Sequence, residues 1–263
     1  MIETIDRQSG PNTIEIRPLT GIGEVHAGDN IASMIVNAIQ GGVSSIEADD
    51  IFVITQKIVS KSEDRWVDLA TIKPSAQAID YAALVKKDPR LVEQVLRESS
   101  AVVRAAPHVL ITRHRCGFVM ANAGIDQSNV GDDSDNRALL LPVDPDRSAR
   151  QLCAALAALI GWPPPVVITD SFGRPWRHGV VPVAIGAAGL PALYDRRGEK
   201  DRDGRVLAVT QTAVADLIAA AAGLVTGEGA EGIPAAIIKG LKLPPGDRPA
   251  ADLIRPPEED LFR

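Results

Sequence analysis

The stretch VVITDSFGR, residues 166–174, decides the fold prediction for this chain of 263 residues. Its first four residues are β-branched or aliphatic without a break, which is typical of a strand buried on both faces. Asp170 and Ser171 follow directly, so a carboxylate and a hydroxyl come at the carboxyl end of that strand. Such a pair is a common way to hold Mg²⁺ or Mn²⁺ against phosphates, although a turn or a helix cap would also explain Asp170.

Similar short apolar runs and helical repeats on either side of this stretch predict the remaining elements. Strands are expected at 51–54, 109–112, 118–120, 205–209 and 235–238. Helices are expected at 31–39, at 89–102 after Asp88, at 145–160 after Asp144, and at 214–225 with Gly227 as the stop. Asp203 and Gly204 predict a hairpin turn. Because helices and strands do not alternate strictly, we expect an α+β fold with a mixed sheet and flanking helices.

Composition excludes several classes of protein. Hydrophobic residues make up 45% of the chain, which is enough for a packed core. There are 28 basic and 34 acidic residues, for a net charge of −6, and only 3% aromatic residues, so a nucleic-acid binder is not expected. No zinc or disulfide spacing, no signal peptide and no membrane-spanning run is visible. We therefore expect a cytoplasmic enzyme without a nucleic-acid or membrane partner.

Polar residues at three further places suggest contacts with an anion or a cation. Lys57 and Lys61 lie four residues apart just after a predicted strand, and Asp126 and Asn129 share a polar turn. Residues 227–232 read Gly-Glu-Gly-Ala-Glu-Gly, but a helix precedes them and a strand follows, the reverse of a dinucleotide-binding fingerprint. Backbone N–H groups of such a loop can still approach an anion. Solvated lysines and a flexible turn are the alternative interpretations.

Arg174 and Arg177 lie in the loop GRPWRHG, residues 173–179. Guanidinium groups match carboxylate and phosphate oxygens bidentately, so in an acidic protein this loop predicts an anionic ligand. A surface loop with Trp176 packed beneath it is the alternative. No Walker A loop and no nucleophile elbow occurs.

Seven blocks of sequence, taken together and in order, resemble the coenzyme F420-0:L-glutamate ligase family. They cover nearly the whole chain, from about residue 13 to about residue 262. The blocks are GIGEVHAGD (21–29), ITQKIVSKSEDR (54–65), NAGIDQSNVG (122–131), LLPVDPDRSA (140–149), VVITDSFGRPWRHG (166–179), AIGAAGLPAL (184–193) and TQTAVADLIAAAAGLVTGEGAEGIPAAIIKG (210–240).

This resemblance implies a GTP-dependent and divalent-metal-dependent γ-glutamyl ligase with a fold specific to the family. The substrates would be coenzyme F420-0, L-glutamate and GTP, and the protein would work as an intertwined homodimer with GTP in a groove near the subunit interface. The ligase domain would span residues 13–243, after an N-terminal extension at 1–12 and before a C-terminal tail at 244–263.

Position by position, the resemblance also implies the site residues. Asp126 and Asp170 would hold one Mg²⁺ or Mn²⁺, Ser171 and Glu228 would hold a second, and K⁺ is a further candidate cation. GTP would contact Ile22, Gly23, Glu24, Val25, Gln56, Lys57, Lys61, Asn129, Thr226, Gly227, Glu228, Gly229, Ala230, Glu231, Gly232 and Ile233. Two departures stand out: Ser171 replaces a common threonine, and Val180 replaces a glutamine.

The chemistry of such a ligase agrees with these residues. Joining a carboxylate to an amine requires an activated acyl group, and transfer of the GTP γ-phosphoryl group would give an acyl phosphate. We expect Lys57 or Lys61 to offset developing charge and Arg174 or Arg177 to bind an acidic substrate. The alternatives are a metal-dependent nucleotide phosphohydrolase, a ligase with a different acidic acceptor, and a nucleotide-sensing module without turnover.

Overall fold

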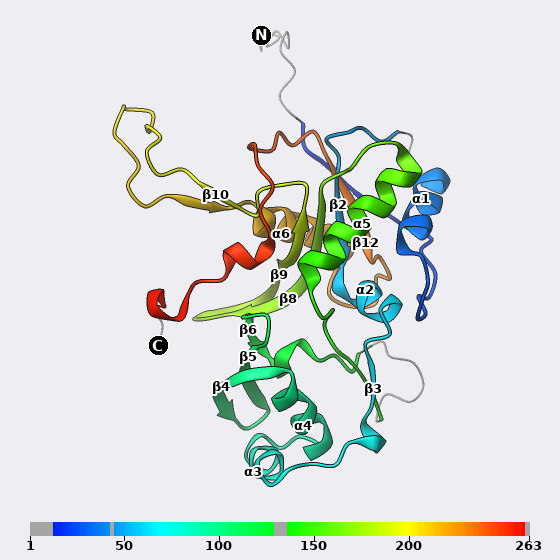
Figure 1. Cartoon of the computed structure of the whole chain (residues 1–263), viewed down its shortest axis with the longest axis vertical. Helices are drawn as coiled ribbons and strands as arrows, with labels where there is room; N and C mark the ends of the chain where they lie inside the picture. Colours follow the sequence, from blue (N-terminus) through cyan, green and yellow to red (C-terminus); the bar gives the residue numbers. More distant parts are fainter. Residues whose placement is uncertain (1–12, 43–44, 129–135, 261–263) are drawn as a thin grey trace, which may run out of the picture.

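The computed structural model describes residues 13–42, 45–128 and 136–260, and a five-stranded sheet lies at its centre (Figure 1). In order across the sheet the strands are β1 (Glu15–Pro18), β12 (Ala235–Lys239), β2 (Ile51–Thr55), β8 (Val166–Arg174) and β9 (Arg177–Ala188). The neighbours β2 and β8 run parallel, whereas the other neighbouring strands run antiparallel. The predicted α+β fold with a mixed sheet is therefore confirmed.

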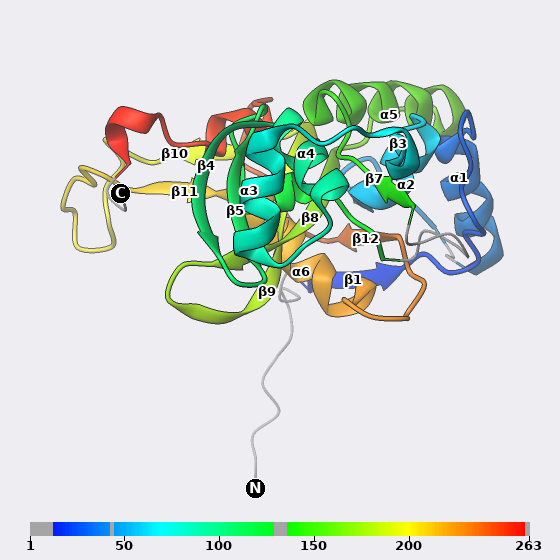
Figure 2. The same cartoon turned by 90° about the horizontal axis from the view of Figure 1, so that it is seen from below.

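Helices cover both faces of this sheet (Figures 1 and 2). On one face, α1 (Ile31–Gly42) and α5 (Pro145–Ile160) share a core with Phe52 and Ile54 of β2. On the other face, α6 (Val214–Thr226) shares a core with Ile51 and Val53. Successive residues of a strand point to opposite faces, so β2 is buried on both sides. This two-sided burial explains its uninterrupted apolar run.

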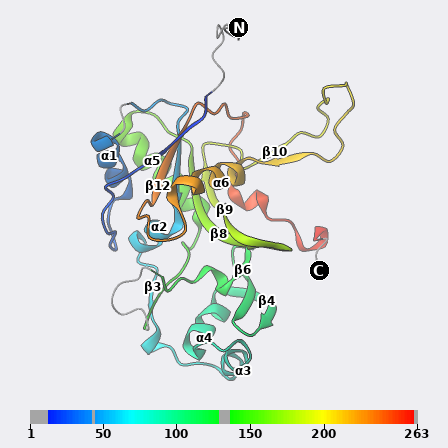
Figure 3. The ribbon, with the colours of Figure 1, turned by 180° about the vertical axis from the view of Figure 1, so that it is seen from behind.

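A smaller layer lies below the main sheet in Figure 1, and Figure 3 shows it from behind. Its core contains Leu69, Val92 and Leu110, none of which is exposed. No helix in the described parts of the chain is both long and apolar enough to cross a membrane. The elements of this layer are α2 (Gln56–Ser62), which leads into it, β3 (Trp66–Asp68), α3 (Ala76–Val85), α4 (Pro89–Arg97), β4 (Ser99–Ala106), β5 (Val109–His114), β6 (Val119–Ala121) and β7 (Arg137–Leu139).

One predicted helix is too long. The prediction of a helix through residue 102 is wrong, because α4 ends at Arg97 and Val102 belongs to β4, where it pairs with Thr112. The hydroxyl of Ser99 donates to the carbonyl of Val95 at 2.6 Å and helps to end the helix. The remaining predicted helices begin and end within a few residues of α1, α5 and α6.

The predicted strand at 205–209 is also wrong. Val206 forms only an isolated bridge with Lys200, and Val209 is 84% exposed. These residues belong to a long connection between β10 (Leu193–Asp195) and β11 (Gln211–Ala213), which Figure 1 shows reaching away from the body. Leu207 exchanges backbone hydrogen bonds with Gly198 and Glu199, but the pairing amounts to one isolated bridge, so β-propensity alone does not make these residues a strand. The turn around Gly204, with φ of 88°, is present as predicted.

A buried carboxylate ties α5 to two distant segments. Asp146, in the first turn of α5, accepts hydrogen bonds from the backbone N–H groups of Ala187 (2.9 Å), Ala250 (2.7 Å) and Ala251 (3.1 Å). Ala250 is fully buried. One side chain thus joins a helix, a strand of the main sheet and the segment near the carboxyl end of the described chain.

Replacing this carboxylate should destabilise the whole fold. We expect Asp146→Ala to lower the free energy of unfolding by about 3 kcal/mol or more, because it leaves buried N–H groups without acceptors. The exposed carboxylate of Asp80 on α3 provides a control, and Asp80→Ala should change stability by less than about 0.5 kcal/mol. Urea unfolding followed by circular dichroism measures both, and equal stability of the two variants would contradict the role given to Asp146.

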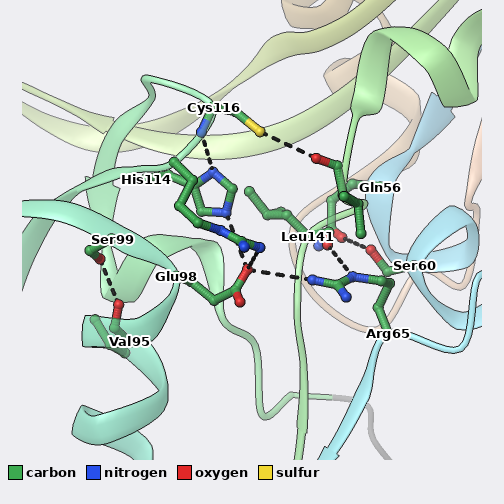
Figure 4. A network of polar contacts seen from close by, with 11 residues as sticks. Gln56, Ser60, Arg65, Val95, Glu98, Ser99, His114, Cys116 and Leu141 are labelled. Carbon is green, nitrogen blue, oxygen red and sulfur yellow. Dashed lines mark hydrogen bonds and ion pairs between the residues drawn. The ribbon is translucent and has the colours of Figure 1, made fainter.

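A second buried carboxylate, Glu98, connects the smaller layer to the chain that leaves α2 (Figure 4). Its Oε2 lies 2.7 Å from Arg115 Nη2 and 3.4 Å from Arg65 Nη2, and His114 Nε2 is 3.7 Å away. Arg65 also donates to the carbonyl of Leu141. Burial acts to raise the pKa of Glu98, but His114 and the charges of Arg115 and Arg65 outweigh it, so the pKa lies below its ordinary value.

This lowered pKa predicts a pH dependence of stability. The charged Glu98 stabilises the fold fully above the ordinary glutamate pKa of about 4.3, and this contribution is lost as the pH falls through the lower folded-state pKa. We expect Glu98→Gln to cost about 2 kcal/mol at pH 7 and to flatten the dependence of unfolding free energy on pH below about 5. Parallel melting curves for variant and wild type, with the same acid sensitivity, would contradict this interpretation.

Candidate active-site cleft

The parallel pair at the centre of the sheet places two polar sequences side by side. Thr55 at the end of β2 pairs with Thr169 of β8, so the residues that follow each of them meet at the same edge. A cleft of about 930 Å³ opens there. It is lined by Ile22, Gly23, Glu24, Val25, Thr55, Gln56, Lys57, Ile58, Lys61, Met120, Ala121, Gly124, Ile125, Asp126, Ser128, Thr169, Asp170, Ser171, Phe172, Gly173, Val180, Pro182, Thr226, Gly227, Glu228, Gly229, Ala230, Gly232, Ile233 and Pro234.

Lys57 and Asp126 form an ion pair in this cleft. Lys57 Nζ lies 2.7 Å from Asp126 Oδ2 and also donates to the hydroxyl of Ser128 at 3.0 Å. Asp126 Oδ1 accepts from the backbone N–H of Ser128 at 2.6 Å. Burial acts to raise the pKa of Asp126, but the hydrogen bonds from Lys57 and Ser128 outweigh it and keep the pKa below its ordinary value. Asp126 is therefore a carboxylate held in its charged form.

Asp170 has the opposite electrostatic character. Burial, helped by the nearby charges of Asp126 and Glu228, raises its pKa to about 7, against the N–H of Ser171 and the ammonium of Lys57. A buried carboxylate beside two others is stable in its charged form only if positive charge is added. This part of the cleft therefore has the electrostatics of a cation site.

The predicted oxygen ligands do not form a compact cluster. Within the described residues, no group of three His, Cys, Asp or Glu side chains is close enough to hold a metal by itself. The charges of Asp126 and Glu228 both act on Asp170, and the hydroxyl of Ser171 donates to Glu228 Oε1 at 2.7 Å. Mg²⁺ typically takes only one or two protein carboxylates and completes its shell with phosphate oxygens and waters. The four predicted metal ligands thus suit a cation that binds together with a phosphate.

The loop after α6 carries Glu228 into the cleft. Gly227 ends the helix with φ of 70°, and a Cβ atom there would lie 2.2 Å from the carboxyl carbon of Glu231. Glu231 folds back and accepts from the N–H of Gly229 at 2.7 Å. This loop therefore already presents an N–H group to a carboxylate oxygen, as an anion-binding loop does. Of the predicted nucleotide contacts at 226–233, Glu231 is the one that does not line the cleft.

Lys61 lies deeper than its position on a short helix suggests. It is 7% exposed, and its Nζ donates to Glu24 Oε2 at 2.9 Å. Glu24 itself is exposed, and the hydrogen bond from Lys61 lowers its pKa. A buried ammonium whose partner is an exposed carboxylate can exchange that partner for another anion at little cost. Because Lys61 is buried and Lys57 is paired with Asp126, neither is a fully solvated surface lysine.

Two predicted arginines do not line the cleft, although Gly173, the residue before Arg174, does. Arg174 ends β8 and Arg177 begins β9, so both sit at the tip of the β8–β9 hairpin, and neither lines the cleft. Arg174 Nη2 donates to the carbonyl of His178 at 3.0 Å. Trp176 is 80% exposed, so it is not packed beneath the loop. The predicted contact at Asn129 lies outside the described residues.

Comparison with known proteins agrees with this geometry. The pattern of the F420-0:Gamma-glutamyl ligase family matches residues 21–240. The coenzyme F420:L-glutamate ligase of Methanothermobacter thermautotrophicus is 45% identical over 255 residues, covering 95% of this chain and 99% of the relative. The ligase of the same name from Methanopyrus kandleri is 44% identical over 258 residues, covering 97% and 99%. This chain therefore belongs to the F420-0:gamma-glutamyl ligase family.

Proposed function

We propose that this protein is a GTP-dependent ligase that joins L-glutamate to the deazaflavin coenzyme F420-0 through γ-linked amide bonds. The observation that supports this most strongly is the single cleft in which Lys57, Asp126 and Asp170 meet the loop of Glu228. The near full-length likeness to enzymes named coenzyme F420:L-glutamate ligase supports the choice of substrates.

The proposed cation is Mg²⁺ or Mn²⁺, bound at two places. Asp126 with Asp170 would hold one ion, and Ser171 with Glu228 the other. The electrostatics support this, since the charges of Asp126 and Glu228 both act on Asp170, and the ammonium of Lys57 is already paired with Asp126. A bound divalent cation would offset the charge of phosphate oxygens. K⁺ is part of the proposal only through the resemblance to the family.

The chain's own residues would bind and orient the nucleotide. Both the ammonium groups of Lys57 and Lys61, which offer positive charge, and the loop at 226–233, whose N–H groups offer donors, line the cleft. Glu24 and Glu231 currently occupy two of these donors. An incoming triphosphate would take their place.

The proposed reaction has two steps and balances as follows. A carboxylate oxygen of the acceptor attacks the γ-phosphorus of GTP, the bond to the β-phosphate oxygen breaks, and GDP leaves. The amine nitrogen of glutamate then attacks the acyl carbon, the bond from carbon to the phosphate oxygen breaks, and inorganic phosphate leaves. The ammonium protons of glutamate pass to solvent. Positioning and charge neutralisation drive both steps, so the protein needs no nucleophile of its own.

We also propose that Arg174 and Arg177 bind an acidic substrate, as their sequence predicts. Both would bind an acidic substrate, and since neither lines the cleft of its own chain, the β8–β9 hairpin would have to approach a cleft. That cleft would be its own or that of a second subunit in the homodimer that the family resemblance implies.

Mass spectrometry of the reaction products tests the proposed function. Purified protein with GTP, Mg²⁺ or Mn²⁺, L-glutamate and F420-0 should give products heavier by one or more glutamyl units, with matching release of GDP. We expect Asp170→Asn to lower the rate by about 100-fold or more, because it removes a charge that faces the transferred phosphoryl group. The control Asp80→Asn changes an exposed carboxylate on α3 and should react like wild type.

The other outcomes distinguish the alternatives. Release of GDP without a glutamyl product would indicate a phosphohydrolase, and a gain of mass on another acid in place of F420-0 would indicate a different acceptor. Binding of GTP without any turnover, with all substrates present, would indicate a nucleotide-sensing module.

A further inference from the structure

A second cavity, of about 410 Å³, lies against the cleft on the side of the smaller layer. Ile125 and Asp126 line both spaces, so together they form the wall between them. On its far side the cavity is lined by Lys87, which lies between α3 and α4, and by Asn122, which follows β6. We call this cavity the Lys87 pocket. Of the metal ligands and nucleotide contacts that the family resemblance implies, Asp126 is the one that lines this pocket.

Lys87 places a positive charge in this pocket that has no carboxylate partner among the described residues. Its Nζ donates to the neutral amide oxygen Oδ1 of Asn122 at 2.8 Å. The side chain is half-buried, and burial lowers the pKa of its ammonium group. A partly desolvated ammonium that meets only a neutral acceptor lacks the counter-charge that would offset the cost of burying it.

The two carboxylates that line the pocket are already paired elsewhere. Asp88 Oδ2 lies 2.6 Å from Arg90 Nη2, and Asp126 Oδ2 lies 2.7 Å from Lys57 Nζ. Neither forms an ion pair with Lys87 in the described chain. The pocket is thus lined by two carboxylates that are paired elsewhere and by the ammonium of Lys87, which pairs with neither of them. A zwitterionic ligand with an extra carboxylate matches this arrangement of charges.

The turn that presents Asn122 to Lys87 is held in an unusual conformation. Asn122, Ala123 and Gly124 all have positive φ angles, of 51°, 53° and 70°. A Cβ atom at Gly124 would lie 2.8 Å from side-chain atoms of Leu141 and Met120, so the surrounding core fixes the backbone there. A left-handed conformation at a residue such as Ala123 costs free energy, and such residues are enriched at functional sites.

We propose that the Lys87 pocket binds the incoming acidic amino acid, L-glutamate, through one of its carboxylates. This inference rests on the proposed ligase function and names the subsite for its amine substrate. The ammonium of Lys87 would pair with the carboxylate, and the amide N–H groups of Asn122 would donate to it. The amine of the bound glutamate would then face Asp126 and the cleft, where the acyl phosphate forms. The nucleotide would occupy the opposite side, along Lys61 and the loop at 226–233.

Steady-state kinetics with each substrate varied in turn tests this assignment. Lys87→Met removes the charge and keeps the length of the side chain, and it should raise the KM for glutamate by about 10- to 100-fold, as the loss of a charge-assisted contact predicts. The KM for GTP should change by less than about 2-fold. Lys86→Met is the matched control, since Lys86 is adjacent and exposed, and it should leave all three KM values unchanged.

A second variant tests the same charge without removing Lys87. Asn122→Asp would place a carboxylate beside the ammonium, where the amide oxygen now lies 2.8 Å away, and Asp tolerates a left-handed backbone. Asn122→Asp should raise the KM for glutamate in the same way. Lys87→Arg keeps the positive charge, so it should raise this KM less than Lys87→Met does. Calorimetric titration of glutamate into the protein with a non-hydrolysable GTP analogue gives an equilibrium measure of the same loss, and thermal melting shows that each variant is folded.

Each outcome is informative. An unchanged KM for glutamate in folded Lys87→Met would overturn the proposal, and so would a rise confined to the KM for F420-0, which would assign the pocket to the acceptor. Absence of glutamyl product from wild-type protein would instead contradict the proposed function, so the two failures are distinguishable.

Discussion

The parallel pairing of β2 with β8 is the constraint on which the rest of this structure depends. It aligns Thr55 with Thr169 and so brings the lysines of α2 to the same edge as Asp170. An antiparallel pairing would put the two carboxyl ends at opposite edges and would leave no shared site. Burial of β2 between α1 and α5 on one face and α6 on the other fixes this pairing. The cleft is therefore a consequence of how the core packs.

The electrostatics of the cleft follow from this position. The edge of a buried sheet has a low effective dielectric constant, so each charge there needs a nearby partner. Lys57 forms an ion pair with Asp126, and Glu24 forms one with Lys61. Among the described residues Asp170 has no ion pair of this kind, and its pKa is raised to about 7. In the proposed reaction, a cation would supply positive charge to Asp170, and a triphosphate would supply negative charge to Lys61. The proposed site would thus suit a cation and a nucleotide that bind together.

Local sequence chemistry predicted the elements that carry their own signals. Asp88 and Asp144, each followed by proline, cap α4 and α5, and the apolar run after residue 165 forms β8. Where local pattern and long-range pairing disagree, the predictions were wrong. Val102 continues a helical repeat but pairs with β5, whereas Val206 has β-propensity but forms only one isolated bridge, with Lys200. Short elements such as α2 carry too few residues for a periodic signal.

The candidate site shows the same difference between residues with a local sequence signal and residues whose place depends on long-range contacts. Asp170, Lys57 and Glu228 could be singled out because each closely follows a recognisable apolar run, although β8 continues past Asp170 to Arg174. Arg174 and Arg177 have equally suggestive chemistry, yet neither lines the cleft, although their hairpin neighbours Gly173 and Val180 do. Lys87 carried no local signal, because its role depends on Asn122, 35 residues later in the chain. Only the three-dimensional arrangement shows that its charge is unmatched.

We propose that the paired strands β2 and β8 build one site in which cation and nucleotide bind together. Calorimetric titration of GTP into wild-type protein, with and without Mg²⁺, tests it most directly. We predict that Mg²⁺ tightens GTP binding by about 10-fold or more, a coupling of ordinary size for two ligands that share a site, and that Asp170→Asn abolishes this difference. The same GTP affinity for wild-type protein with and without Mg²⁺ would contradict the account.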